Sequence, residues 1–288
     1  MSAVIEAVGT APESLRRMQL SGVDLEVWSE GSGRDLLILH PGDGPAHDAP
    51  YLDALSKRYR VTLPSHPGFG GSSLPEFMNS VDDLAYFYLD FIETLGLRDY
   101  VLVGFSFGAW IACEIAIRSK AGLAGLVLVD ALGAKFEGPR KREILDLFSY
   151  PQYEQARLIY HEAERQEPDY RAWDDDALTR LARNHASFAL FAWSPTLHSP
   201  KLRHRLHRIT VPTHILWGAQ DRVVTPDYGR RFAAAIPDST FKLIEGAGHY
   251  PHVERAAEFV REVEAFTASL PGAAQAAVQP AVQPVLAR

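Results

Sequence analysis

Short apolar runs recur along most of the chain, each about as long as a strand that is buried on both faces of a sheet. They are DLLILH (35–40), RVTL (60–63), YVLVGF (100–105), GLVLVD (125–130), THILWG (213–218) and TFKLIE (240–245). Between these runs, apolar residues return at helical spacing, as in residues 48–57 and 81–95. The alternation from residue 35 onward predicts an α/β fold with a mostly parallel sheet and helices on both of its faces.

The two ends of the chain depart from this alternation. Residues 1–13 are predicted to be a flexible lead-in, and residues 16–31 alternate well enough for two strands that turn at Ser21-Gly22. Beyond residue 270 the chain is rich in Ala, Pro and Gln, and AVQP occurs twice. Such a composition cannot build a core, so we predict a disordered tail over residues 271–288.

Residues 133–208 contain no convincing strand pattern. Helical patterns follow one another at 140–148, 152–166 and 176–193, with a basic helical run at 201–208. An all-helical insertion between two strands of the sheet predicts a cap over the strand ends, on a core formed by residues 14–132 and 209–270. The cap is rich in aromatic residues, most of which we expect to pack its own interior, although some must face the space beneath it.

The sharpest local signal is YVLVGFSFGAWIACEIAI (100–117), in which a buried strand changes into a helix with almost no loop between them. Ser106 occupies the corner, with Gly104 and Gly108 two positions away on either side. A turn this tight strains the central residue and leaves no room for neighbouring side chains, which glycine provides. The pattern predicts a serine hydroxyl lifted clear of the sheet at the positive end of a helix.

Composition limits the classes of function. The net charge of −7 argues against nucleic acid or an anionic membrane as partner, and the single cysteine, Cys113, excludes an intramolecular disulfide. The first residues lack the basic flank and long apolar core of a secretory signal, so we expect a cytoplasmic protein. The expected partner is a small-molecule substrate; self-association into a homo-oligomer is left open.

Four separated motifs in this order resemble those of α/β-hydrolases: HPGDG (40–44), GFSFG (104–108), WGAQDRVV (217–224) and GAGHYPH (246–252). The resemblance covers residues 16–270. It implies an eight-stranded sheet with a helical cap and a site that needs no metal or organic cofactor. The PGFGGSS loop also resembles the family, but His66 stands where an aspartate commonly precedes this loop, and its role is left open between bracing the turn and lining the pocket.

A serine hydroxyl needs an adjacent base, and the chain order of the family implies the triad Ser106, Asp221 and His249. His249 follows the last predicted strand and has small neighbours that let its ring lean toward Ser106. His252 is the nearest rival base but falls a turn into the next helix. Asp130, at the end of the strand after the elbow helix, is the competing acid, because some hydrolases use that position.

The oxyanion of the tetrahedral intermediate needs hydrogen-bond donors. The backbone N–H of Phe107 is one candidate, and Gly42 is the second, with Asp43 as the fallback, because Pro41 has no N–H. The residues expected at the substrate pocket are His40, Asp43, Phe105, Trp193 and Tyr250, with a structural role in bracing its loop as the other interpretation of His40, and the one that is favoured.

These residues predict a serine hydrolase that forms an acyl-enzyme, with an uncharged or weakly polar ester as the first expectation for the substrate. A first alternative is hydrolysis of a carbon–carbon bond in a ring-cleavage product, although many such enzymes have tryptophan directly after the catalytic histidine, where Tyr250 stands. Further alternatives are a cofactor-free perhydrolase or haloperoxidase, and a ligand receptor on the same fold with slow turnover.

Overall fold

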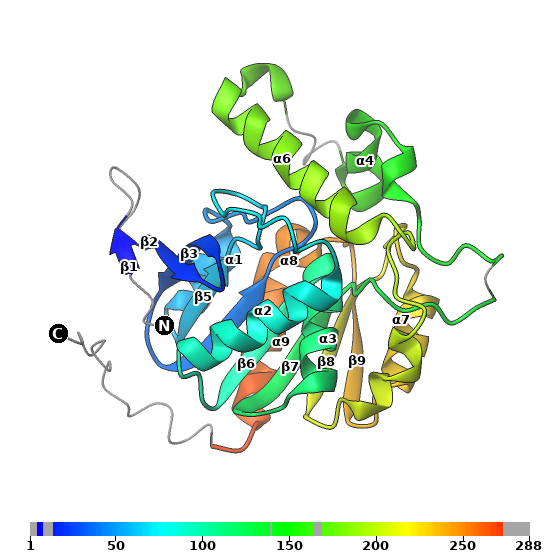
Figure 1. The fold of residues 1–288 in the computed structure, drawn as a ribbon. Coiled ribbons are helices and arrows are strands. Elements are labelled where there is room, and N and C mark those ends of the chain that lie inside the picture. The colour runs from blue at the N-terminus through cyan, green and yellow to red at the C-terminus, as the bar shows by residue number, and fades with distance from the viewer. Residues whose placement is uncertain (1–4, 8–13, 139, 164–168, 273–288) are drawn as a thin grey trace.

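A nine-stranded sheet forms the centre of the computed structural model, which describes residues 5–7, 14–138, 140–163 and 169–272 (Figure 1). The strand order is β1-β2-β3-β5-β4-β6-β7-β8-β9. The strands are β1 (Ile5–Ala7), β2 (Leu15–Leu20), β3 (Val23–Glu30), β4 (Arg34–Leu39), β5 (Tyr59–Pro64), β6 (Tyr100–Phe105), β7 (Leu123–Val129), β8 (Thr213–Gly218) and β9 (Ser239–Ile244).

The six strands from β4 onward are parallel, while β1, β2 and β3 pair antiparallel at one edge. This confirms the predicted α/β fold with a mostly parallel sheet. The ninth strand is the three-residue β1, which lies inside the segment predicted as a lead-in. It pairs with β2, which follows that segment. The predicted tail lies outside the described residues from position 273 onward.

Helices cover both faces of the sheet and enclose two apolar cores (Figure 1). One core contains residues of α2 (Val81–Thr94), α3 (Phe107–Arg118) and α7 (Pro226–Ala234). The other contains residues of α1 (Pro50–Ser56) and α9 (Ala256–Ser269), which follows the short α8 (Pro251–Glu254). Because side chains alternate along a strand, β6 sends Leu102 into the first core and Phe105 into the second.

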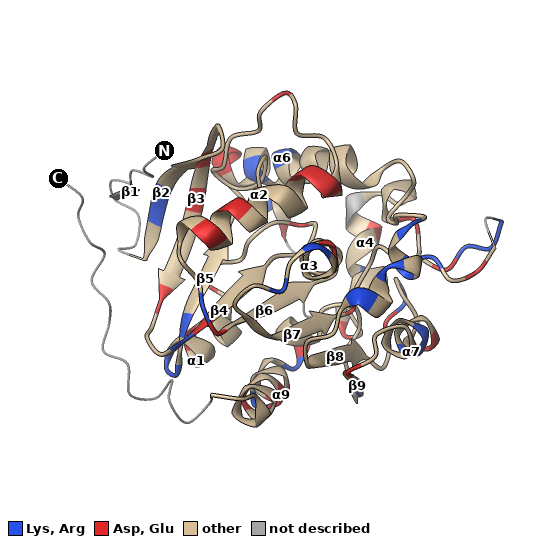
Figure 2. Cartoon of the chain, turned by 60° about the horizontal axis from the view of Figure 1, so that its bottom comes forward, with Lys and Arg blue, Asp and Glu red and all other residues tan. Residues whose placement is uncertain are grey.

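Three neighbouring strands of the sheet carry no charged side chain. Figure 2 shows acidic and basic residues on the helices and connecting loops, whereas β6, β7 and β8 carry neither kind. These three strands are therefore mostly apolar, as a parallel sheet covered on both sides requires, with Thr213 and His214 at the start of β8 as the polar exceptions. Among the described residues, no helix is both long and apolar enough to cross a membrane.

The segment predicted as the cap, and called the cap below, occupies the chain between β7 and β8, and its helices lie at one end of the sheet (Figure 1). Among its described residues, the helices are α4 (Gln152–Ile159) and α6 (Asp175–Ala192), and single 3₁₀ turns lie at η1 (Leu147–Ser149), η2 (Tyr170–Ala172), η3 (Leu202–His204) and η4 (Leu206–Arg208). The basic run at 201–208 thus forms two 3₁₀ turns rather than one helix.

The helix predicted over residues 140–148 does not form. Ile144 makes an isolated antiparallel bridge with Val224, and the Leu145 N–H donates to the Val223 carbonyl at 2.8 Å. These backbone hydrogen bonds are made to the loop after β8, so a tertiary contact overrides the local helical pattern. Helix α7 was not predicted, although Thr225 caps its first turn and Pro226 opens it, which are ordinary helix-start signals.

Candidate active site

The turn between β6 and α3 holds Ser106 in a backbone conformation that few residues other than glycine adopt. Its φ is 51° and its ψ is −109°, and its N–H donates to the Val129 carbonyl at 2.8 Å. Such a conformation costs about 1–3 kcal/mol and persists where the surrounding structure imposes it. The strand-to-helix elbow predicted from the sequence is therefore present.

The two glycines of the motif are explained by close backbone contacts. A Cβ at Gly104 would lie 2.6 Å from the Cα of Ala109, on the helix that turns back over the strand. A Cβ at Gly108 would lie 2.1 Å from the Leu39 carbonyl oxygen and 2.5 Å from that of His40. The first turn of α3 therefore rests directly against the end of β4, which brings the loop after β4 beside Ser106.

Ser106, His249 and Asp221 form a continuous hydrogen-bonded row although they are far apart in the sequence. Ser106 Oγ lies 2.8 Å from His249 Nε2, and His249 Nδ1 lies 2.8 Å from Asp221 Oδ2. The side chains of His249 and Asp221 are fully buried, and Ser106 is 3% exposed. This arrangement matches the order nucleophile, base and orienting carboxylate that activates a serine hydroxyl.

The rival residues take other places. Asp130 is wholly buried, and its Oδ1 accepts the Gly218 N–H at 2.9 Å, whereas the His249 ring bonds to Asp221 instead. Asp221 is further held by the N–H groups of Val223 and Val224, at 2.7 and 3.1 Å. We therefore retain Asp221 as the proposed acid.

The rival base, His252, packs against the apolar core on the side of the sheet covered by α1 and α9. Its ring stacks on Phe105 at a centroid distance of 3.9 Å. Phe105, which was predicted to line the pocket, is therefore fully buried in that core, on the face of the sheet covered by α1 and α9. This corrects the prediction: because Phe105 follows the side-chain alternation of β6, it points away from the cap.

Two neighbouring imidazoles, those of His40 and His66, brace the loop after β4 with their ring planes tilted by 31°. The backbone N–H of His66 donates to the ring nitrogen Nε2 of His40 at 2.9 Å. The ring proton of His40 is therefore on Nδ1, which donates to the Pro41 carbonyl at 2.7 Å. His66 Nε2 in turn donates to the His40 carbonyl at 3.0 Å, and its Nδ1 accepts from the Tyr88 hydroxyl. The ring centroids lie 3.6 Å apart.

Both nitrogens of each ring are therefore engaged within the protein. Of the two roles predicted for His40, bracing its loop and contacting substrate, the structure supports the brace, because it leaves no ring nitrogen of His40 for a substrate. The same holds for His66, whose role the sequence left open. Tyr88 was missed, because nothing in a helical pattern distinguishes a tyrosine that packs from one that also donates a hydrogen bond.

The loop after β4 is the proposed second half of the oxyanion hole. Phe107 is the first residue of α3, so its N–H has no partner within the helix. Gly42 is buried, and a Cβ there would lie 2.7 Å from the ring of Phe188 in α6. These positions support the proposal that the Phe107 and Gly42 amides bind the oxyanion.

Asp43 and Tyr250, two of the predicted pocket residues, are brought together. The Tyr250 hydroxyl donates to Asp43 Oδ2 at 2.9 Å, which joins the loop that carries His249 to the loop after β4. Trp193 lies apart, 58% exposed at the end of α6, with its ring packed on Phe148.

The cap touches both loops of the site. The His249 N–H donates to the Ile159 carbonyl of α4 at 2.6 Å, and the ring of Phe188 packs on Phe107 at 5.2 Å between centroids. Asn184 of α6 was missed in the sequence: its Nδ2 donates to the Asp43 carbonyl at 2.8 Å, and its Oδ1 accepts the Gly70 N–H at 2.9 Å. A polar residue on the inner face of α6 was the available signal.

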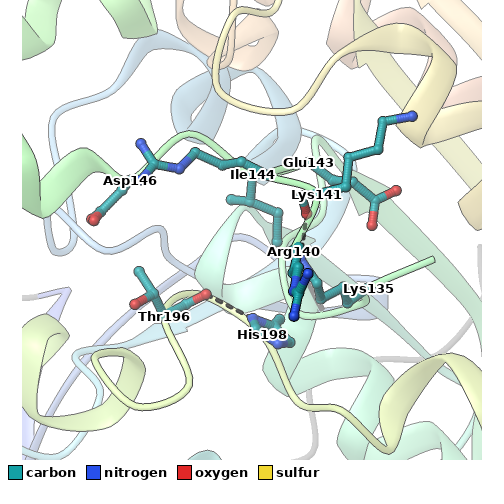
Figure 3. A pocket seen from close by; sticks show the side chains of 9 residues that line it. Lys135, Arg140, Lys141, Glu143, Ile144, Asp146, Thr196 and His198 are labelled. Carbon is teal, nitrogen blue, oxygen red and sulfur yellow. Dashed lines mark hydrogen bonds between the residues drawn. The ribbon is translucent and has the colours of Figure 1, made fainter. Parts of the chain in front are cut away.

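A separate pocket of about 290 Å³ lies where the chain enters and leaves the cap (Figure 3). It contains none of the three triad residues. Many of its polar groups satisfy one another: the Lys135 ammonium donates to the Lys141 carbonyl, and His198 bonds to the Thr196 carbonyl, both at the distances of ordinary hydrogen bonds. The pocket is lined by Lys135, Arg140, Lys141, Arg142, Glu143, Ile144, Asp146, Thr196 and His198.

Asp130, Asp221 and His249 are the one group of His, Cys, Asp or Glu side chains, within the described part of the chain, that is close enough to share a metal ion. Both ring nitrogens of His249 are already hydrogen-bonded, to Ser106 and Asp221. A metal ion on either nitrogen would break the row. We therefore propose that the three groups serve serine chemistry.

Buried neutral histidines predict a loss of stability in acid. Burial lowers the pKa of His66 and of His252 to about 3 in the folded protein, against about 6.5 in an unfolded chain. Between these values the unfolded chain binds protons that the folded chain does not. The free energy of unfolding should therefore fall as the pH drops below 6.5, by up to about 1.4 kcal/mol per pH unit for each histidine, and should not change from this cause above it.

His252→Phe tests this expectation, because the new ring keeps the aromatic packing on Phe105 and removes one titrating group. Urea unfolding at pH 5, 6, 7 and 8 should give a shallower decline below pH 6.5 for the variant than for the parent. An identical decline in both proteins would show that His252 does not contribute.

The family model described as the alpha/beta hydrolase family matches residues 36–262, which is most of the chain. The chain therefore belongs to the alpha/beta hydrolase family and is a hydrolase.

The chain is similar in sequence to known hydrolases and in fold to a solved structure. The chain is 29% identical to 2-hydroxy-6-oxo-6-phenylhexa-2,4-dienoate hydrolase of Comamonas testosteroni, over 80% of this chain and 86% of that protein. It is 26% identical to 2-hydroxy-6-oxo-2,4-heptadienoate hydrolase of Pseudomonas putida, over 88% and 96%. The meta-cleavage product hydrolase CumD of Pseudomonas fluorescens IP01 superposes with a TM-score of 0.70 at 24% identity, covering 87% of this chain and 96% of CumD.

Proposed function

We propose that the chain is a serine hydrolase in which Ser106 attacks a carbonyl carbon and His249 accepts the hydroxyl proton. The observation that carries this proposal is the buried row from Ser106 Oγ through His249 to Asp221, with two contacts of 2.8 Å. The amides of Phe107 and Gly42 bind the oxyanion, and the protonated His249 supplies a proton to the leaving group. Water, activated by His249, then hydrolyses the acyl-enzyme.

For the bond that is broken, the first candidate is a carbon–carbon bond next to a ketone, as in a ring-cleavage product. Its support is that the relatives at 25–29% identity carry names of such hydrolases over 80–94% of this chain. In this reaction the electron pair of the broken bond passes to a carbon that is conjugated with a second carbonyl, and that carbon takes up the proton. The similarity to these relatives thus favours carbon–carbon bond hydrolysis over the ester hydrolysis that the sequence first suggested.

The second candidate, hydrolysis of an uncharged ester, is favoured by Asp43. Its carboxylate, which accepts the Tyr250 hydroxyl at 2.9 Å, lies in the loop after β4 and next to the residue that follows His249. A negative charge there repels a substrate carboxylate, which the dienoate named in the Comamonas relative carries. The apolar side chains of Phe188 and Phe191, which pack on Phe107, suit a neutral acyl group instead.

Labelling with a fluorophosphonate probe, with Ser106→Ala as control, tests the serine mechanism. Turnover of 2-hydroxy-6-oxo-6-phenylhexa-2,4-dienoate, followed by loss of its absorbance and release of benzoate, then tests the first candidate against a chain-length series of nitrophenyl esters. Labelling with ester turnover alone would reject carbon–carbon cleavage. Absence of labelling and of turnover in both series would reject the serine hydrolase itself.

A further inference from the structure

Asp130 is a second buried carboxyl group beside the proposed triad. It follows β7 directly with a φ of 45°, a conformation that holds its side chain against the end of β8. Oδ1 accepts the Gly218 N–H, whereas Oδ2 is buried and has no hydrogen-bond partner among the residues that the structure describes. An ionised oxygen in that position would lose its hydration without gaining a donor, which is costly.

Asp221 lies close enough to affect this carboxyl group directly. One carboxyl oxygen of Asp130, one of Asp221 and one ring nitrogen of His249 all lie within 4.8 Å of one another. Two ionised carboxylates at that separation repel each other by about 3–4 kcal/mol at an effective dielectric constant of 20. Since both groups are buried, the pair is expected to hold one negative charge and one proton.

The donors around the pair decide which carboxyl group keeps the charge. Asp221 accepts hydrogen bonds from three N–H groups, those of residues 223 and 224 and of the triad imidazole, whereas Asp130 accepts one. Burial raises the pKa of Asp130 well above its ordinary value, and the nearby carboxylates of Asp221 and Glu254 act in the same direction. The charge therefore belongs to Asp221 and the proton to Asp130.

We propose that Asp130 is a neutral carboxylic acid in the resting enzyme, with its proton directed at Asp221, and that it serves as a reserve carboxylate for His249 when Asp221 is neutralised. When Asp130 takes over this role, only its O–H bond breaks: the proton leaves to water and the electron pair stays on the carboxyl oxygen. Asp130 is thus a positioning residue in the parent enzyme. This inference rests on the proposed triad.

Infrared spectroscopy tests the protonation without reference to activity. At neutral pH the parent should show the carbonyl band of a protonated, buried carboxylic acid, and Asp130→Asn should lose it. Asp221→Asn should lose it as well, because the repulsion is then gone and the His249 ring can donate to an ionised Asp130 in place of Asp221. The exposed Asp227→Asn is the matched control and should retain the band. A parent without the band would overturn the proposal, even if the protein proves to have no hydrolase activity.

A double-mutant cycle tests the reserve role. Asp130→Asn alone should lower kcat/KM less than Asp221→Asn does, and Asp221→Asn should keep measurable activity. The double variant should fall at least tenfold below Asp221→Asn, with circular dichroism confirming that each variant is folded. If Asp221→Asn lowered kcat/KM by the same factor in the parent and in the Asp130→Asn variant, the reserve role would be overturned. Should Asp221→Asn fail to fold, the infrared comparison of the parent with Asp130→Asn still decides the protonation.

Discussion

Ser106→Ala is expected to lower kcat by about 10⁶-fold while leaving the fold intact. Alanine keeps the backbone of the elbow, whose φ of 51° is imposed by the β6–α3 turn, and removes only the hydroxyl that lies 2.8 Å from His249 Nε2. Without it no acyl-enzyme can form, so the burst of product from a nitrophenyl ester should vanish together with steady-state turnover. Stopped-flow and steady-state assays on the purified variant measure both.

The matched control for this variant is Ser119→Ala at the other end of α3. Its hydroxyl oxygen accepts the Ala121 N–H at 3.3 Å and takes no part in the site. This variant should keep the parent's turnover within experimental error. If Ser106→Ala kept a substantial fraction of the activity, the nucleophile would have to be another residue and the proposed mechanism would be rejected.

Gly108→Ala is expected to have a large effect for the addition of a single methyl group. The added Cβ would lie 2.1 Å from the Leu39 carbonyl oxygen and 2.5 Å from that of His40, and backbone atoms cannot rotate away as a side chain can. The loop after β4 must therefore move off α3. We expect a loss of about 3 kcal/mol in the free energy of unfolding and a loss of about 10²-fold in kcat, because the two oxyanion amides separate.

Urea unfolding and kcat on the same preparation measure both effects. Gly138→Ala is the control, because a Cβ there meets nothing within 4 Å, and it should change the free energy of unfolding by less than about 0.5 kcal/mol. A Gly108→Ala protein as stable and active as the parent would mean that α3 does not rest on the end of β4.

Local patterns in the sequence predicted the elements well wherever one short signal decided the conformation. The apolar residues of the runs at 35–40, 100–105, 125–130 and 213–218 lie in strands that are buried on both faces of the sheet. The run at 240–245 forms the edge strand β9, most of whose residues are partly or fully exposed. The segment 140–148 shows where this reasoning ends. Its helical pattern is weaker than the backbone hydrogen bonds that Ile144 and Leu145 make with the loop after β8, a partner 80 residues away that no local pattern reveals.

The site shows the same division. The elbow at Ser106 is a local feature, since the strand, the two glycines and the helix are contiguous, and its strained φ follows from that sequence alone. The placement of Phe105 below the sheet also follows the alternation of β6, and the prediction of a pocket residue there was wrong because it followed closeness in sequence rather than direction. His66 could be interpreted only once Tyr88 and His40 were seen to take up its ring nitrogens.

The sequence by itself determined the class of fold, the position of the strained serine and the order of the loops, because each depends on residues that are near one another in the chain. The tertiary structure alone decided which carboxyl group His249 contacts, since Asp130 and Asp221 reach the same buried space from different strands. It also decided that Asp43 meets Tyr250 across 207 positions of sequence. Such contacts depend on how parallel strands align their ends, which is a property of the whole sheet.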